Sequence, residues 1–338
     1  HFIIDQQTFY GVFHLEDVIF EETNPIFQSI NGVVYTYNLS ELVYYPPKKS
    51  TIEYPIQNTT TIIKSTAFNN YSLSSIIVPN SVTSIGEGAF QGANNLTSIT
   101  LPFVGGSRST STTVSSSGSS RQYLFGYIFG STTLTNTSNA TNRVYQGQPA
   151  SGSNYRHYYI PSSLTSITIT DANGISANAF YGMTNVTSIS LNEGITFIGN
   201  NAFYGMTGLE SMEVPSSVIT IGTHAWYNNT SLAAITLSDI TTIPAYAFYG
   251  TTSLTGIDIP ETITQINEYA FYNAGLTSLT LPDSTTSIDN YAFYGLSGIT
   301  TLVIPENVQS IGSYAFRGAN NVTSLTFNSN VLSTIGNF

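Results

Sequence analysis

The chain has 338 residues, of which 41% are hydrophobic, 13% aromatic and only 8% charged, and its formal net charge is −11. It contains no cysteine, which excludes a disulfide framework and a thiolate metal site. No run of 18 or more apolar residues occurs, so we expect no membrane insertion within this chain. Ser, Thr and Asn are abundant, and we expect their hydroxyl and amide groups to supply solubility, as is common on cell surfaces.

Residues 1–20 show a pattern that returns later in the chain. Ile4 precedes the aromatic Phe9 by five residues, and Leu15, Val18 and Phe20 follow at regular intervals. We predict that this segment is a first, incomplete coil of a repeat structure. We also expect the natural polypeptide to continue past at least one end of the chain, because stacked coils need polar caps.

Residues 21–61 interrupt this pattern. Asn31-Gly32 is a strong turn signal, and it is followed by the apolar segment 33–37, a polar break at 38–41 and a second apolar segment at 42–47. We therefore predict a β-hairpin insertion over 21–61. Regular repeat coils then resume over 62–102.

Residues 103–161 form a second interruption, which is Ser- and Thr-rich, basic and aromatic. Its first tract is too polar to pack and is typical of a flexible loop. An aromatic segment at 123–130 and a closing segment at 155–161 follow. Because Phe90 and Phe180 are 90 residues apart, which is four repeat lengths, the repeat phase survives the interruption.

Charge distinguishes this insertion from the rest of the chain, because residues 103–170 carry four arginines and no Asp or Glu. Aromatic residues and arginine are favoured at interface hot spots, which makes the insertion a candidate partner-binding surface. Packing of its aromatic segment against the coils is the alternative. We expect the arginines to be exposed, since burying four unpaired cations would be prohibitive. The candidate residues are Arg108, Arg121, Tyr123, Phe125, Tyr127, Phe129, Arg143, Arg156 and His157.

Residues 162–338 are the most regular part of the chain and stop in the middle of a coil. An alanine followed by an aromatic residue recurs every 22 or 23 residues, which indicates a solenoid of stacked coils. The apolar triplets 257–259, 279–281 and 325–327 alternate with strand period. A Tyr-Gly pair after most aromatic residues leaves room for a single helical turn. The recurring pairs are Ala179-Phe180, Ala202-Phe203, Ala225-Trp226, Ala247-Phe248, Ala270-Phe271, Ala292-Phe293 and Ala315-Phe316.

This pattern resembles the BspA-type leucine-rich repeat, which occurs in a family of cell-surface proteins. The resemblance covers residues 1–20, 62–102 and 164–338. It implies a leucine-rich-repeat solenoid of about ten to eleven coils, mostly β, with short parallel strands and single helical turns. It also implies an extracellular setting and an adhesive or ligand-binding role. The family's usual cysteine, three residues after the aromatic position, is replaced here by Met183, Met206, Asn229, Thr251, Ala274, Leu296 and Ala319.

Catalytic chemistry is sparse in this sequence. No nucleophile elbow, phosphate loop or H-E-x-x-H motif occurs. His224 stands where other coils have tyrosine, so we interpret it as a repeat variant. Asp171-Ala172-Asn173-Gly174 resembles the opening of a calcium loop but lacks the later ligands, which favours a tight turn. We predict no enzymatic activity, no cofactor and no metal site.

Ten N-x-S/T sequons are present, which is close to the number expected by chance in so polar a chain. Three of them, at 95, 185 and 321, share one repeat phase just before a strand. Sugars on one flank of successive coils and hydrogen bonding of Asn to the backbone are alternative interpretations. The candidate N-glycosylation residues are Asn38, Asn58, Asn70, Asn95, Asn136, Asn139, Asn185, Asn228, Asn229 and Asn321.

These observations favour an extracellular or cell-surface protein that serves adhesion or ligand binding. Its partner would be a host or matrix protein or an acidic glycan, and we expect no nucleic-acid partner. The alternative is a structural protein whose copies self-associate into a surface layer or fibre, with the basic insertion of one copy meeting the acidic face of another.

Overall fold

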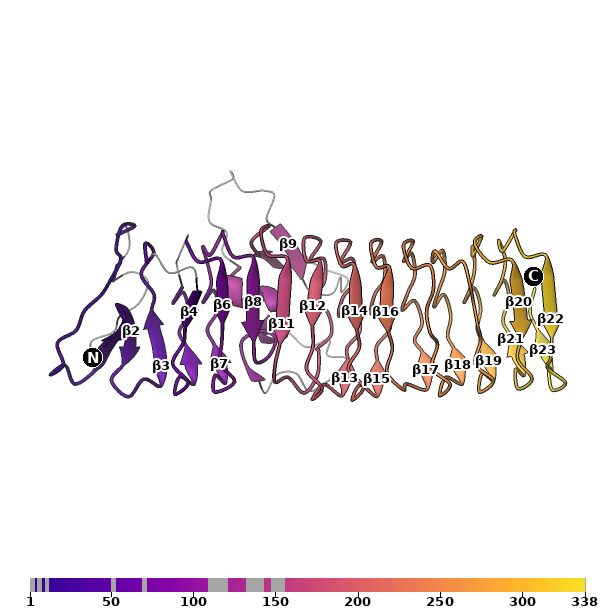
Figure 1. Cartoon of the computed structure of the whole chain (residues 1–338), viewed down its shortest axis with the longest axis horizontal. Coiled ribbons are helices and arrows are strands. Elements are labelled where there is room, and N and C mark those ends of the chain that lie inside the picture. Colours follow the sequence, from indigo (N-terminus) through magenta and orange to yellow (C-terminus); the bar gives the residue numbers. More distant parts are fainter. Residues whose placement is uncertain are drawn as a thin grey trace. The chain divides into compact units, whose positions relative to one another are not determined.

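The computed structural model describes residues 4, 8–9, 12–49, 53–68, 72–108, 121–131, 143–146 and 156–337. The described residues form the coils of a β-solenoid, about eleven in all, with parallel strands and almost no helix, as the repeat pattern predicts. It divides into two compact units, with residues up to Ala172 in unit 1 and residues from Asn173 onward in unit 2. Figure 1 shows that the labelled strands of each unit are stacked side by side.

Unit 1 contains two sets of parallel strands, to which most coils contribute one strand each. The first sheet pairs β4 (Glu53–Pro55), β6 (Ser75–Ile77), β8 (Ser98–Leu101) and β11 (Ser166–Ile169). The second pairs β3 (Glu41–Tyr44), β5 (Ile62–Ile63) and β7 (Ser84–Ile85). Between β8 and β11 the chain forms η2 (Arg121–Tyr123), η3 (Phe125–Phe129) and an antiparallel pair of β9 (Arg143–Gln146) with β10 (Arg156–Tyr159).

The N-terminal end of unit 1 is an antiparallel arrangement of three strands. β1 (Phe27–Ile30) pairs with β2 (Val33–Thr36) across the Asn31-Gly32 turn, and β2 pairs with β3. β3 also pairs in parallel with β5, and the ring of Tyr45 stacks on Phe68 with ring centroids 5.0 Å apart. The hairpin is therefore part of the stack of coils, because Tyr44-Tyr45 stands where other coils have Ala-Phe.

Unit 2 repeats the same plan in successive coils. Its strands are β12 (Ser188–Ser190), β13 (Phe197–Ile198), β14 (Ser211–Glu213), β15 (Thr220–Ile221), β16 (Ala234–Thr236), β17 (Thr242–Ile243), β18 (Gln265–Ile266), β19 (Ser287–Ile288), β20 (Thr301–Ile304), β21 (Ser310–Ile311), β22 (Ser324–Phe327) and β23 (Thr334–Ile335). The strands pair in parallel as β12-β14-β16, β13-β15, β17-β18-β19-β21-β23 and β20-β22.

Two of the three predicted triplet strands are absent. The segment 325–327 lies in β22, but 257–259 and 279–281 form no strand. Ile259 and Leu281 are nevertheless buried, so the inward side of the alternation persists. Gly256 stands where Ala234 opens β16, and glycine weakens strand pairing of the segment 257–259 because it loses more conformational freedom and packs no side chain.

The core of unit 2 is a column of aromatic rings, which lie at the predicted recurring Ala-aromatic pairs. Neighbouring rings lie within 11° of parallel, with centroids 5.1 to 5.7 Å apart. The backbone reinforces this column, since the Phe203 N–H donates to the Ala225 carbonyl oxygen at 2.9 Å. Each alanine is buried, and its small side chain lets adjacent corners approach closely. The column contains Phe180, Phe203, Trp226, Phe248, Phe271, Phe293 and Phe316.

Serine and threonine hydroxyls hold neighbouring coils together. The Thr286 hydroxyl donates to the Thr264 carbonyl at 2.9 Å, and the Thr264 hydroxyl donates to the Thr241 carbonyl at 3.2 Å. Ser284 and Ser217 make equivalent bonds to the preceding coil, at 2.6 and 2.7 Å. Much of the hydroxyl content that the composition assigns to solubility therefore bonds adjacent coils.

Candidate binding surface

The aromatic segment of the insertion is buried and completes a coil. The Phe90 N–H donates to the Ile128 carbonyl at 2.8 Å, and the Phe129 ring lies 6.1 Å from the Phe90 ring. Ile128-Phe129 thus takes the place of Ala-Phe. Tyr123, Phe125 and Phe129 are all buried, which favours the alternative that the aromatic segment packs against the coils. The described residues between β8 and β11 therefore belong to one enlarged coil.

Within this enlarged coil, the backbone at two glycines packs closely against tyrosine rings. A Cβ atom at Gly126 would overlap the ring of Tyr158, and one at Gly106 would overlap the ring of Tyr127. The Gly126 N–H donates to the Gln146 side-chain oxygen at 2.7 Å, which ties η3 to β9. Glycine is required at 106 and 126 because no larger residue fits.

Arg108 is paired and half-buried, contrary to the expectation that the arginines are exposed. Its guanidinium forms an ion pair with the Asp171 carboxylate and lies 5.8 Å from the centre of the Phe103 ring. It also donates to the Asn80 carbonyl oxygen at 2.7 Å. The expectation of exposure applied to unpaired cations. Arg108 has a partner because Asp171 directly follows the acid-free stretch 103–170. Arg108 therefore fastens the start of the enlarged coil to its end.

The remaining candidates are less buried. Arg121 is exposed, and Tyr127 and His157 are half-buried. Burial raises the pKa of Tyr127, and the nearby Glu87 carboxylate raises it further. Arg143 and Arg156 belong to β9 and β10, but their side chains lie outside the described part of the chain. Among the candidate arginines whose side chains the structure describes, Arg121 is the exposed one.

Two surface ladders of aromatic rings run along unit 2. Rings within each ladder stack at 4.5 to 5.2 Å, and rings of opposite ladders lie 5.5 to 6.5 Å apart at 31° to 47°. All of these rings are half-buried. The first ladder contains Tyr181, Tyr204, Tyr227, Tyr249, Tyr272 and Tyr294, and the second contains His224, Tyr246, Tyr269, Tyr291 and Tyr314.

The ladders predict a loss of stability at alkaline pH. Burial first, and then neighbouring phenols or Glu268, raise the pKa of Tyr246, Tyr269 and Tyr272 above 10.0. The unfolded chain therefore ionises first. The stability from these neutral phenols is complete below pH 10.0 and is lost as the pH rises through the folded-state pKa. Urea unfolding at rising pH should show this fall, and a Tyr269→Phe, Tyr272→Phe variant should show a smaller one. An equal fall in both proteins would contradict the prediction.

His224 is confirmed as a repeat variant. Its ring stacks on Tyr246 at 4.5 Å and 4° from parallel, and burial lowers its pKa. Among the described residues no group of three or more His, Cys, Asp or Glu side chains could hold a metal ion. Within the same part of the chain, no helix is long and apolar enough to cross a lipid bilayer.

The sequons differ in their exposure. Asn229 is buried, and its side-chain oxygen accepts a hydrogen bond from the Met206 N–H at 3.0 Å, so the folded protein has no room for a sugar there. Asn70, Asn136 and Asn139 lie outside the described residues. The exposed sequon residues are Asn38, Asn58, Asn95, Asn185, Asn228 and Asn321.

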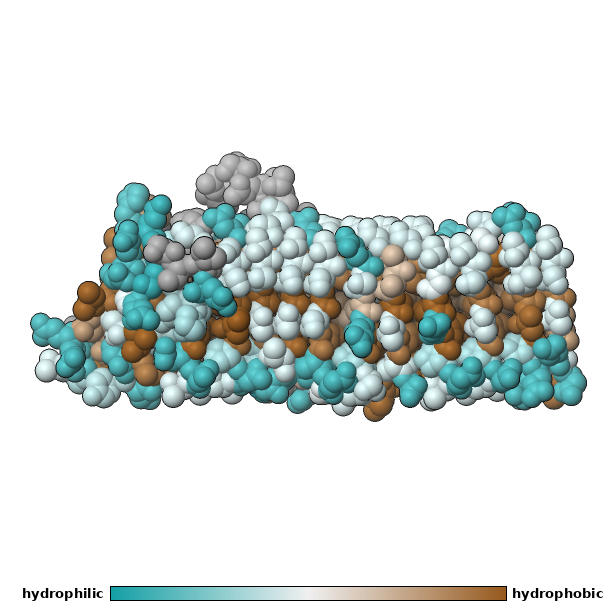
Figure 2. Space-filling view, in the orientation of Figure 1, coloured by the Kyte–Doolittle hydropathy of each residue, from teal (hydrophilic) through white to brown (hydrophobic). Residues whose placement is uncertain are grey.

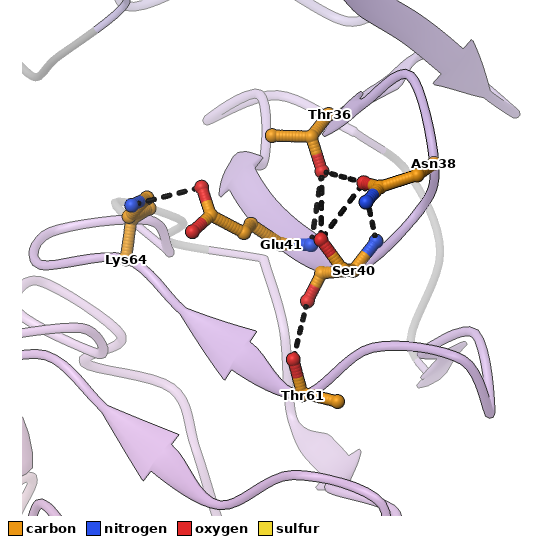
Figure 3. Close-up of polar contacts among 6 residues, drawn as sticks. All are labelled: Thr36, Asn38, Ser40, Glu41, Thr61 and Lys64. Atoms are coloured by element: carbon orange, nitrogen blue, oxygen red, sulfur yellow. Dashed lines mark hydrogen bonds and ion pairs between the residues drawn. The ribbon is translucent and has the colours of Figure 1, made fainter.

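Asn38 illustrates how an exposed sequon is held (Figure 3). Its side-chain oxygen accepts hydrogen bonds from the Ser40 hydroxyl at 2.8 Å, the Ser40 N–H at 3.2 Å and the Thr36 hydroxyl at 2.9 Å. The adjacent Glu41 carboxylate pairs with the Lys64 ammonium at 2.8 Å. The turn between β2 and β3 is thus fixed by the same asparagine that would carry a sugar.

Comparison with protein families finds one matching family model. The model of the BspA type leucine-rich repeat region matches residues 39–136, 153–274 and 241–338, in six copies. No protein of curated function matches the chain.

Several solved structures are similar to this chain. A leucine-rich repeat protein from Bacteroides ovatus is 21% identical with a TM-score of 0.49, and the match covers 95% of this chain and 67% of the Bacteroides ovatus chain. A leucine rich cell surface protein from Faecalibacterium prausnitzii is 17% identical with a TM-score of 0.34, and the match covers 92% of this chain and 97% of the Faecalibacterium prausnitzii chain. The pneumococcal vaccine antigen PcpA is 16% identical with a TM-score of 0.37, and the match covers 96% of this chain and 79% of the PcpA chain.

Proposed function

The chain belongs to the BspA-type leucine-rich repeat family, and we propose that it acts outside the cell or at its surface as a non-catalytic protein for adhesion or ligand binding. Its partner would be a host or matrix protein or an acidic glycan. Sugars on the exposed sequons would be compatible with this role, since they would extend into solvent from coil surfaces.

The observation that carries this proposal is the regular outer face of the parallel sheet. In β12, β14 and β16 the central residues Ile189, Met212 and Ile235 are buried, while the flanking positions are exposed. Those flanking positions hold mainly small or hydroxyl side chains. Figure 2 shows pale polar columns across this face of unit 2, with brown apolar groups between them. Repeat proteins use such extended surfaces for binding.

The basic insertion adds a second contact surface in unit 1. Arg121 is exposed, and Arg143 and Arg156 follow in the same acid-free stretch of sequence. Cations in this setting favour an acidic partner, and their attraction should weaken with salt. Deleting residues 103–161 would not test this idea, because the deletion would also remove Phe129 from the core.

We expect an Arg121→Ala, Arg143→Ala, Arg156→Ala variant to bind an acidic glycan such as heparin at least about tenfold more weakly at low salt. Binding is measured by surface plasmon resonance on the full chain, alongside immobilised matrix protein. Lys48→Ala is the matched control, since it removes a cation of unit 1 outside the insertion. Unchanged binding of the triple variant to both probes would place the contact elsewhere.

A further inference from the structure

The second aromatic ladder occupies an unusual backbone conformation. His224, Tyr246, Tyr269, Tyr291 and Tyr314 have φ angles between 57° and 59°. This left-handed region is unfavourable for bulky side chains and far easier for asparagine. Backbone strain of this kind is concentrated at functional sites, where the surrounding structure maintains it.

The same backbone position shows which residue would fit with less strain. Asn178 and Asn201 occupy it in the two preceding coils, with φ angles of 59° and 55°. Five successive coils therefore hold an aromatic ring where asparagine would adopt the same backbone conformation more easily. The rings build a surface that asparagine could not build.

That surface presents ring edges rather than ring faces. Tyr249 is stacked between Tyr227 and Tyr272, with centroids 4.5 and 4.7 Å away, so both of its faces are covered. The edge of an aromatic ring carries partial positive charge and attracts the π face of another ring. A flat aromatic molecule lying along the ladders would contact the edges of several rings at once.

The negative charge of unit 2 favours a positively charged molecule at the ladders. Residues 173–338 contain ten Asp and Glu and one cation, Arg317, which gives a formal net charge of −9. Glu268 directly precedes Tyr269, and its carbonyl oxygen accepts a hydrogen bond from the Tyr246 N–H at 3.0 Å. Its carboxylate helps to raise the pKa of both phenols. At the end of the second ladder the Arg317 guanidinium lies over the face of the Tyr314 ring, 5.1 Å from its centre, so the one cation of unit 2 already contacts the ladder.

We propose that the paired ladders form a binding strip for flat, cationic aromatic molecules. The edges of Tyr246, Tyr269 and Tyr291, together with the first ladder beside them, contact the face of the ligand. Glu268 supplies the local negative charge. The strip lies wholly within unit 2 and does not depend on the enlarged coil of unit 1.

The test uses thioflavin T, a flat benzothiazole cation, as the probe. It is titrated into the full chain, with sedimentation to confirm that the measured species is not aggregated. We expect saturable binding that is at least tenfold weaker in a Tyr246→Asn, Tyr269→Asn, Tyr291→Asn variant. Asparagine is chosen because it fits this backbone at 178 and 201, and an unchanged circular dichroism spectrum verifies the fold. Should the triple variant fail to fold, the single Tyr269→Asn variant must show the same direction of change.

Two further measurements separate the contributions of shape and charge. Glu268→Gln should weaken binding of the dye by about threefold without affecting its uncharged benzothiazole analogue, since only the cation gains from the carboxylate. Tyr37→Asn is the control for losing an exposed tyrosine outside the ladders. Equal binding of the dye to wild type and the asparagine variants would overturn the proposal, as would equal affinity of wild type for the dye and its uncharged analogue.

Discussion

Replacing Trp226 with alanine should lower the free energy of unfolding by about 3–5 kcal/mol. The indole is fully buried between Phe203 and Phe248, with ring centroids 5.7 and 5.3 Å away, and its N–H donates to the sulfur of Met212 at 3.2 Å. Truncation leaves a cavity that the neighbouring coils cannot fill, because each is held in register by its own backbone hydrogen bonds. Urea unfolding followed by circular dichroism measures the loss.

Trp226→Phe is the matched control for this substitution. Phenylalanine occupies the same position in the adjacent coils, so the variant should keep the stack and lose about 1–2 kcal/mol for the missing volume and the lost N–H donor. Hydrogen exchange should show the alanine variant opening first in the coils next to 226, since each coil contacts only its neighbours. An alanine variant as stable as the phenylalanine variant would contradict the continuous aromatic column.

Replacing Phe129 with alanine should destabilise unit 1 by about 3–5 kcal/mol. Phe129 is buried, and its ring lies 5.5 Å from Phe125 and 6.1 Å from Phe90. If the insertion were a decoration on a complete solenoid, this change would leave the coils intact. Because Phe129 completes a coil, we expect the loss to reach the exchange-protected amides of β8 and β11.

Arg121→Ala is the control for the Phe129 experiment. Arg121 lies in the same insertion but is exposed, so its removal should change the free energy of unfolding by less than about 0.5 kcal/mol. Unchanged protection of Ser98–Leu101 in the Phe129→Ala protein would show that the enlarged coil does not support the sheet.

The repeating part of the fold could be predicted because its signal is local and periodic. An Ala-aromatic pair every 22 or 23 residues specifies both the corner of the coil and the ring that fills it. The enlarged coil was not predictable in the same way, since Ile128-Phe129 lacks the alanine and stands 39 residues after Phe90. The 90-residue distance from Phe90 to Phe180 suggested an unbroken phase. In the structure, one enlarged coil with its corner at Phe129 occupies much of that interval.

The surface features depend on distances between coils, which a linear pattern does not reveal. The Thr264 and Thr286 hydroxyls bond to carbonyls of the preceding coil only because the stacking brings them within 3.2 and 2.9 Å. Likewise, Arg108 meets Asp171 across 63 residues of sequence. The tyrosine ladders had a visible signal, the recurrence of Tyr at two fixed phases, but their left-handed backbone could be recognised only in three dimensions.

The pairing of β8 with β11 has a consequence for how such proteins diversify. Ser98 lies directly opposite Ser166, although ordinary neighbouring coils are separated by only about a third of that sequence distance. The register of the sheet is therefore kept across this long connection, with Phe129 filling the corner. Foreign segments grafted at this junction should leave the paired strands aligned if they keep Phe129, Gly106, Gly126 and the Arg108–Asp171 pair, which makes the junction a place for engineering new recognition.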